Sequence, residues 1–230
     1  MFDVIIPLRS GSRGIKNKNI IKFQSSNLVN YTLKKVINIK EINRIFILTN
    51  SIKYKKKILK NKKINLDYPR PNNLSGSNAK IFDLIKDFIF WSNKKKMNVN
   101  KIILLQVTSP LIKKKEIENT LKFIIKKKID SLFHVTKMIE HPYECIFKKN
   151  SKKWSFLVKN NSVNRQNFNN KYYFINGSLF YFTKKFFLKH KKTFINKSTA
   201  YEVDKINFVD IDTLFDLHVA KKIVGLKTRN

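Results

Sequence analysis

The sequence predicts an α/β fold in which a mainly parallel sheet is covered by helices on both faces. Short apolar runs of strand length alternate with segments of helical apolar spacing over the first 135 residues, and this pattern is typical of parallel strands joined by crossover helices. The length of 230 residues and the hydrophobic content of 42% suit a single domain, 1–230, with a substantial core. An aromatic content of 13% argues against disorder.

The expected elements follow in order along the first part of the chain. The predicted strands are apolar runs at 2–8, 44–49, 64–68, 101–107 and 131–136. The predicted helices repeat apolar residues every three or four positions at 28–39, 80–91 and 117–125, and a basic surface helix is expected at 53–61. Ligands of such folds bind beyond the carboxyl ends of the strands, where Arg9, Thr49, Thr108 and Ser109 are expected to lie.

Residues 138–173 interrupt this alternation. They are polar, rich in Lys and Asn, and contain short alternating segments such as 154–158, which predicts a β-rich insertion. From the residues alone, this insertion is a lid, a dimerisation arm or an unstructured excursion. Regular structure is expected again at 178–182, and the chain is expected to close with a strand at 206–209 and a helix at 214–224.

The composition is strongly basic. Lys and Arg total 49 against 15 acidic residues, a formal net charge of +34. A basic surface attracts nucleic acid, but these lysines are spread over nearly every segment, whereas a binding tail would concentrate them. We therefore expect compositional drift, with no dedicated nucleic-acid or membrane partner. The single cysteine excludes a disulfide scaffold. No apolar run approaches the ~18–20 residues that span a membrane and no signal-peptide pattern is present, so we expect a cytoplasmic protein.

Arginine and glycine are scarce in this lysine-rich chain, and both gather in the loop after the first strand. Gly and Ser in Arg9–Asn19 permit tight turns whose backbone N–H groups can converge on phosphate oxygens. Arg9, Arg13 and Lys18 add positive charge there. The pattern is neither a P-loop nor a dinucleotide-binding motif. The residues alone leave open whether this loop binds phosphate or is a basic surface loop.

Two carboxylates, Asp210 and Asp212, follow the predicted strand 206–209. Positions i and i+2 of an extended segment share a face, and two hard oxygen ligands on one face suit Mg²⁺ completed by water and phosphate oxygens. The alternative is a helix N-terminus, in which Asp212 or Thr213 caps the helix and Asp216 stabilises its first turn. Both interpretations are compatible with each other.

Gln106 ends an otherwise apolar predicted strand. Its amide is placed to reach a base or a sugar hydroxyl, or else it is a buried amide satisfied by backbone groups. His134 is expected to be a core or interface histidine, and Cys145 a structural residue. No His/Cys spacing predicts zinc.

Several of these segments together resemble one known family, the acylneuraminate cytidylyltransferases, or CMP-sialic acid synthetases. The first loop, Ile6-Pro7-Leu8-Arg9-Ser10-Gly11-Ser12-Arg13-Gly14-Ile15-x-x-Lys18-Asn19, is similar to the family's signature. Further similar segments come in the family's order: Arg70-Pro71 with Asp83, Gln106-x-Thr108-Ser109-Pro110-Leu111, His141-Pro142, Arg165-Gln166, Asn176-Gly177, and Val209-Asp210-Ile211-Asp212-Thr213 with Asp216-Leu217. The resemblance covers about Asp3 to Ala220.

The resemblance implies a Rossmann-like α/β/α nucleotidyltransferase that joins CTP to a nine-carbon α-keto acid sugar and releases pyrophosphate. It implies CTP binding by the first loop and by Arg70, which would lie near cytosine; the loop residues are Arg9, Ser10, Gly11, Ser12, Arg13, Gly14, Lys18 and Asn19. It implies a sugar site at Gln106, Arg165, Asn176 and Phe180. Asp210 and Asp212 would bind the Mg²⁺ cofactor, and Arg9, Lys18 and Asp210 would be catalytic. The insertion 138–173 would be an arm exchanged across a homodimer.

The chain departs from the family pattern at a few positions, among them Ile112, where an Arg is common. Three further departures, at Ser77 and Lys80, at Phe180 and at Glu144, bear on sugar recognition and leave the sugar open. Legionaminic acid or another nonulosonic acid is therefore as plausible as N-acetylneuraminate. The rivals are a related transferase using pseudaminate or 3-deoxy-manno-octulosonate, a basic nucleic-acid-binding protein, and an inactive homologue. The high charge, as a further hypothesis, raises encounter rates with anionic substrates.

Overall fold

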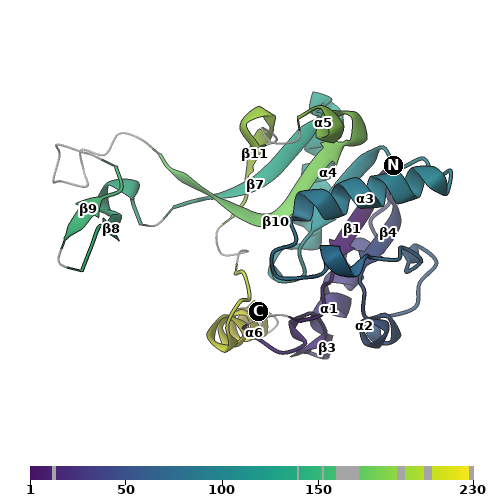
Figure 1. Ribbon diagram of the computed structural model, residues 1–230, viewed down its shortest axis with the longest axis horizontal. Coiled ribbons are helices and arrows are strands. Elements are labelled where there is room, and N and C mark those ends of the chain that lie inside the picture. Colours follow the sequence, from purple (N-terminus) through teal and green to yellow (C-terminus); the bar gives the residue numbers. More distant parts are fainter. Residues whose placement is uncertain are drawn as a thin grey trace.

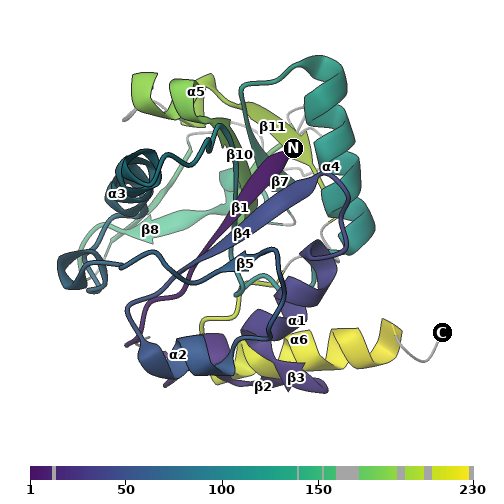
Figure 2. The same cartoon turned by 90° about the vertical axis from the view of Figure 1, so that its right-hand side faces the viewer.

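The computed structural model describes residues 1–11, 14–138, 140–151, 153–158, 171–190, 195–204 and 209–227. A seven-stranded sheet lies between two layers of helices, as Figures 1 and 2 show. This arrangement confirms the predicted α/β class. Within the described segments, no helix has both the length and the apolar character needed to cross a membrane.

The sheet has the order β11-β7-β10-β6-β1-β4-β5. Its strands are β1 (Phe2–Pro7), β4 (Ile42–Leu48), β5 (Ile64–Asn65), β6 (Lys101–Leu105), β7 (Ser131–Lys137), β10 (Tyr173–Thr183) and β11 (Thr199–Glu202). The pairs of β1 with β4 and β6, of β4 with β5, and of β7 with β11 are parallel. Among these described strands, only β10 runs antiparallel to its neighbours, β6 and β7, so the sheet is mainly parallel as predicted.

Six α-helices occur in the described residues: α1 (Leu28–Val36), α2 (Ile52–Lys57), α3 (Ile81–Lys94), α4 (Lys114–Lys127), α5 (Lys184–Lys189) and α6 (Leu214–Lys227). Asn27 and Ser51 cap α1 and α2 by accepting backbone N–H groups through their side chains. Short α5 is not among the predicted elements. The predicted helix 53–61 is shorter than expected, because Ile58 turns to extended backbone and is buried.

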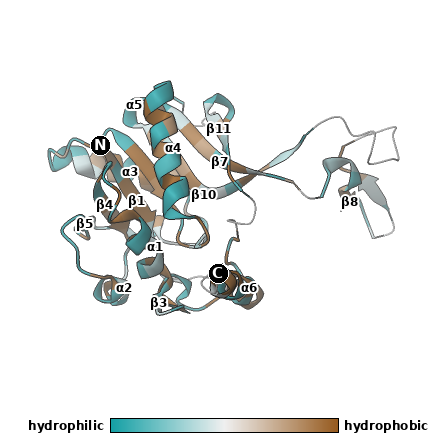
Figure 3. Cartoon of the chain, turned by 180° about the vertical axis from the view of Figure 1, so that it is seen from behind, coloured by the Kyte–Doolittle hydropathy of each residue, from teal (hydrophilic) through white to brown (hydrophobic). Residues whose placement is uncertain are grey.

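Two apolar cores occupy the two faces of the sheet. In Figure 3 the central strands are mostly brown, the colour of hydrophobic residues, and the helices carry much of the teal of hydrophilic residues. One core packs α1 and α4 against residues such as Val4 and Ile103. The other packs α3 and α5 against Ile5, Phe46 and Leu104. Successive residues of β1 thus enter opposite cores, which is why the central strands are apolar throughout.

A β-rich projection replaces the sheet pattern after β7. It carries β8 (Ile146–Lys148) and β9 (Trp154–Phe156), which pair antiparallel and form a small sheet of their own. In Figure 1 this hairpin stands well away from the body, at the end of β7 and β10. A second small hairpin, β2 (Lys22–Phe23) and β3 (Ser26–Asn27), precedes α1. The strand predicted at 206–209 falls mostly outside the described residues.

Candidate active site

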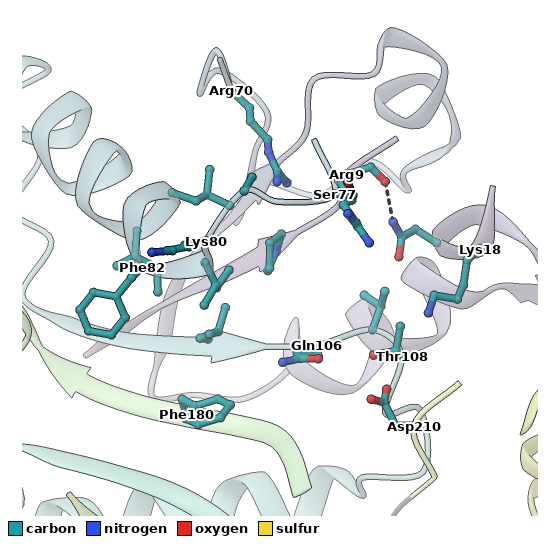
Figure 4. Close-up of a pocket in the computed structure, with 18 of the residues that line it drawn as sticks. Arg9, Lys18, Arg70, Ser77, Lys80, Phe82, Gln106, Thr108, Phe180 and Asp210 are labelled. Carbon is teal, nitrogen blue, oxygen red and sulfur yellow. Dashed lines mark hydrogen bonds between the residues drawn. The ribbon is translucent and has the colours of Figure 1, made fainter. Parts of the chain in front are cut away.

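A cleft of ≈ 660 Å³ opens at the carboxyl ends of β1 and β6. Parallel strands bring these ends to one edge of the sheet, so residues far apart in sequence meet there. Arg9 follows β1, Gln106 and Thr108 follow β6, and Phe180 comes from β10; Asp210 and Asp212 enter from the segment before α6. Figure 4 shows most of these side chains around the same space.

The first loop supplies the positive end of the cleft. Arg9, Lys18 and Asn19 all line it. Asn19 is buried and its amide donates to the Arg9 carbonyl at 3.1 Å, a bond drawn in Figure 4. The Lys18 ammonium donates to the Asp212 carboxylate at 2.7 Å, joining positions 194 residues apart. The loop therefore closes onto the segment that carries the two acidic residues.

The remaining loop residues have different surroundings. Ser10 donates to the Asn50 side chain through its hydroxyl at 3.1 Å and does not line the cleft. Gly11 has φ +81°, a conformation that favours glycine. Gly14 lines the cleft, and a Cβ built on it would lie 2.2 Å from the Asp212 carbonyl oxygen. Ser12 and Arg13 lie outside the described residues.

Arg70 lines the cleft but uses its guanidinium to hold the chain. Its Nη1 donates to the Leu48 carbonyl at 3.0 Å, and its Nε and Nη2 donate to the Leu74 carbonyl at 3.1 and 2.7 Å. Burial lowers the pKa of Arg70 to about 10, with a smaller contribution from the charge of Arg9. The structure thus shows a role for Arg70 that the sequence did not predict: it ties the end of β4 to the turn before α3.

Asp210 and Asp212 both line the cleft, with buried Ile211 between them. This confirms the predicted alternation, which is anchored where the Ile211 N–H donates to the Thr108 carbonyl at 2.8 Å. Partial removal from water raises the pKa of Asp210, and the nearby charge of Asp212 adds to the rise; the Thr108 hydrogen bond and Lys18 oppose it. The ionised Asp210 carboxylate is thus disfavoured mainly by burial, which a cation bound beside it would offset.

The helix-cap interpretation holds as well, with Thr213 and not Asp212 as the capping residue. The Thr213 hydroxyl accepts the Asp216 N–H at 3.2 Å, and Asp216 accepts the N–H groups of Thr213 and Asp212 at 2.7 and 3.0 Å. These hydrogen bonds, led by that from the Thr213 backbone, lower the pKa of Asp216. Because Thr213 and Asp216 form the cap, the side chains of Asp210 and Asp212 are left to face the cleft.

The two aspartates suit a hard cation. Carboxylate oxygens are the protein ligands that Mg²⁺ prefers, and it commonly takes only one or two from the protein together with substrate phosphates. Within the ranges that the structure describes, no group of three or more His, Cys, Asp or Glu side chains gathers as a metal site. Asp210 and Asp212 therefore fit a cation shared with a phosphate ligand and do not form a closed metal cage.

The opposite end of the cleft is mostly apolar. Phe82, Phe180, Phe182 and Phe187 line it, and the rings of Phe82 and Phe187 stack with centroids 4.4 Å apart. Figure 4 shows Gln106 between this end and Asp210, with Lys80 near Phe82. The sequence does not predict Phe82 and Phe187 as cleft residues, because each looks like an ordinary helix residue in the linear chain. Lys80 and Ser77, which the comparison with the family pattern singles out, both line the cleft.

The predicted sugar residues divide into three groups. Gln106 and Phe180 line the cleft. Asn176 is buried beside it, since a Cβ on the following residue, Gly177, would lie 3.6 Å from the Gln106 amide nitrogen. Arg165 lies outside the described residues. His134 is fully buried, as predicted for a core histidine.

A sequence model of the cytidylyltransferase family matches residues 4–226. The chain belongs to this family. The match covers nearly every element of the fold, including the first loop and the Asp210–Asp212 segment, and it confirms the resemblance read from the motifs. By family, the chain is accordingly placed among nucleotidyltransferases.

Curated relatives of the chain act on two kinds of sugar, according to their names. An N-acylneuraminate cytidylyltransferase of Streptococcus agalactiae serotype III is 29% identical over 223 residues, covering 94% of this chain and 51% of the relative. A pseudaminic acid cytidylyltransferase of Campylobacter jejuni serotype O:2 is 26% identical over 220 residues, covering 94% and 93%. The chain thus spans about half the length of the N-acylneuraminate relatives that it matches.

Solved structures share the fold. CMP:2-keto-3-deoxy-manno-octonic acid synthetase complexed with CTP aligns with a TM-score of 0.71 at 11% identity, covering 99% of this chain and all of the other. A 4-diphosphocytidyl-2C-methyl-D-erythritol synthase from Anaerococcus prevotii aligns with a TM-score of 0.64 at 16% identity, covering 97% and 96%. These similarities confirm the α/β/α architecture of the chain.

Proposed function

We propose that this cytidylyltransferase joins CTP to a nonulosonic acid and releases pyrophosphate. The observation that carries the proposal is the convergence of Arg9, Lys18, Asp210 and Asp212 at one end of a cleft whose other end is apolar. The charged end suits a triphosphate, and the remaining length suits a substituted sugar. The names of the relatives support a nine-carbon keto acid as the acceptor.

In the proposed reaction, the anomeric hydroxyl attacks the α-phosphorus in line with the bond to the β-phosphate. The new P–O bond forms as the α–β bridging bond breaks, and pyrophosphate leaves. Arg9 and Lys18 offset the phosphate charge, while Asn19 holds the Arg9 backbone in place. Such catalysis depends mainly on positioning and charge. Lys18 is well placed for this role, because its ion pair with Asp212 fixes the ammonium at the cleft.

We assign Mg²⁺ to the Asp210 and Asp212 carboxylates as part of the same proposal. When bound, the ion supplies positive charge that stabilises the leaving pyrophosphate. The raised pKa of Asp210 supports this assignment, because burial and, to a smaller extent, the charge of Asp212 disfavour its carboxylate when no cation is beside it. We expect the reaction to occur in the cytoplasm, where CTP is available.

Within the nonulosonic acids, the main alternative to a sialic-type acceptor is pseudaminate. A specific observation favours it as the second candidate: the pseudaminic acid relative matches this chain over 93% of its own length, whereas the N-acylneuraminate relatives match over about half of theirs. The two candidates share the reaction and the phosphate end of the cleft, and differ only at the apolar end.

A pyrophosphate-release assay tests the proposal. The purified chain is incubated with CTP, Mg²⁺ and, in parallel, N-acetylneuraminate, legionaminate, pseudaminate or 3-deoxy-manno-octulosonate. Release is expected with one of the nonulosonic acids, and replacing CTP by ATP or omitting the metal should abolish it. Lys18→Met should abolish release, while Lys16→Met, an exposed lysine of the same loop, should not. If every sugar fails, the proposed function is wrong.

We also propose that the β8–β9 hairpin joins two copies of the chain. Its strands expose large apolar side chains: Trp154 is 60% and Phe156 62% accessible, and Ile146 and Leu157 are similarly exposed. An apolar patch on a projecting hairpin is stable in water when another surface covers it, and a second copy is the occupant we favour. Sedimentation of the wild type should give a dimer, and Trp154→Ser with Phe156→Ser should give a monomer; a monomeric wild type would overturn this proposal.

A further inference from the structure

A buried chain of hydrogen bonds runs from α4 through β7 to β10 beside the cleft. It begins at the Thr120 hydroxyl, which lies 2.8 Å from the Glu116 carbonyl and 2.9 Å from His134 Nε2. On the other side of the ring, His134 Nδ1 lies 3.1 Å from the Ser178 hydroxyl. The Ser178 hydroxyl in turn lies 2.8 Å from Asn176 Oδ1, which also accepts the Ser178 N–H at 3.0 Å.

This hydrogen-bond network has fewer protons to donate than it has donor–acceptor contacts. Burial lowers the pKa of His134 to about 3, so its ring is neutral and carries one N–H. The Thr120 and Ser178 hydroxyls add one proton each, and neither carbonyl oxygen can donate. Four contacts therefore share three protons, and one contact must stay unmade. The position of the imidazole proton decides which one.

The two tautomers leave opposite ends unmade. With the proton on Nε2, His134 donates to Thr120, Thr120 donates to Glu116, and Ser178 turns to His134, so Asn176 loses its hydroxyl donor. With the proton on Nδ1, His134 donates to Ser178, Ser178 donates to Asn176, and Thr120 turns to His134. The Glu116 carbonyl then loses the hydroxyl, although in α4 it still accepts the helical N–H of Thr120.

The unmade contact costs less at the α4 end. The Glu116–Thr120 contact is only partly buried, whereas the Ser178–Asn176 contact is fully buried. Each oxygen keeps a backbone N–H donor in either tautomer, so what is lost is one hydroxyl bond, and that loss costs most where water cannot replace the hydroxyl. We propose that His134 is a positioning residue which, as the neutral Nδ1–H tautomer, holds the Asn176 carboxamide through Ser178 for substrate binding. The His134 ring is itself held beside Tyr201, with centroids 5.6 Å apart.

The hydrogen-bond network ends on the Asn176 carboxamide, whose nitrogen is a buried donor beside the cleft wall. Asn176 is 3% exposed, and its Nδ2 has no hydrogen-bond partner among the described residues. Gly177, at φ +69°, turns the backbone against the Gln106 carboxamide at the cleft wall. Because Oδ1 is fixed by two Ser178 donors, Nδ2 is fixed as well, and we assign it to a sugar oxygen beside Gln106. This last step rests on the proposed function; the tautomer does not.

Two measurements test the inference separately. A long-range ¹H–¹⁵N spectrum of the uniformly labelled chain distinguishes the ring tautomers, and loss of signals in His134→Asn assigns the residue among the four histidines. We expect a neutral Nδ1–H ring. An Nε2–H ring would overturn the inference, whether or not the chain is active. If no sugar is accepted in the release assay, the proposed function fails while the tautomer result still stands.

The kinetic test removes one buried hydroxyl at a time. Ser178→Ala removes the link between His134 and Asn176 and should raise KM for the sugar about tenfold with KM for CTP unchanged. Ser92→Ala is the matched control, because it removes a buried serine hydroxyl outside this network and away from the cleft, and it should leave both constants within about twofold. His134→Asn, whose amide nitrogen replaces Nδ1, should retain more sugar affinity than His134→Gln, whose nitrogen replaces Nε2. Equal effects of Ser178→Ala and Ser92→Ala on the two KM values would overturn the positioning role.

Discussion

Gly14→Ala is expected to separate the first loop, Arg9–Asn19, from the segment that carries Asp210 and Asp212. A Cβ on Gly14 would lie 2.2 Å from the Asp212 backbone oxygen, whereas such contacts essentially never fall below 3.0 Å. One of the two segments must therefore retreat by at least 0.8 Å. The obstacle is backbone, so no side-chain rotation relieves it. The retreat moves Lys18 and the two cleft aspartates apart.

The magnitude follows from this displacement. A misplacement of about 1 Å among catalytic groups costs roughly 10²-fold in rate, equivalent to about 2.7 kcal/mol in the activation barrier. We expect kcat/KM for pyrophosphate release to fall by roughly this factor, with the thermal unfolding midpoint used to confirm that the variant folds. Gly76→Ala is the matched control, because a Cβ there meets no atom within 4 Å and its backbone is unstrained. Near-wild-type turnover of a folded Gly14→Ala variant would refute the reasoning.

Three further perturbations have defined outcomes. Asp210→Asn should lower kcat/KM by about 10²-fold or more. It should not lower the unfolding midpoint, because folding raises the pKa of this carboxyl and so disfavours its charge. Full turnover of the variant would exclude both the metal-binding and the catalytic role of Asp210. Lys35→Met should lower the free energy of unfolding, measured with urea, by about 1–3 kcal/mol, because Lys35 donates to two backbone carbonyls after β6. The control is Lys34→Met, at an exposed neighbouring lysine. Equal losses of stability in the two variants would contradict this reasoning. Because hydrogen bonds lower the folded pKa of Asp216, its stabilisation is present above the ordinary carboxyl pKa of about 4 and is lost as pH falls through the folded value. Asp216→Asn should therefore show less acid destabilisation than the wild type in thermal melts from pH 5 to about 2.

The sequence was sufficient for the α/β class and for most elements of the body. Apolar periodicity is a local signal. In a buried strand such as Ile102–Leu105, alternate side chains enter the two cores on opposite faces of the sheet, so every position of the strand is apolar. The motifs also predict Arg9, Gln106 and Asp210 as site residues, and all three line the cleft. Element ends were less accurate: β6 stops at Leu105, which leaves Gln106 beyond the strand.

The sequence by itself determined the family, the strand–helix order and the residue types of the site, because these depend on local pattern and on motif order. Tertiary structure alone decided the antiparallel direction of β10, the Lys18–Asp212 ion pair across 194 positions and the use of Arg70 to hold backbone carbonyls. It also decided that Thr213, and not Asp212, caps α6. The first three are contacts between segments distant along the chain, and each depends on which partners the packed sheet brings within hydrogen-bond distance. The cap is a local contact, but the sequence offers two candidates for it, and only the folded geometry selects Thr213.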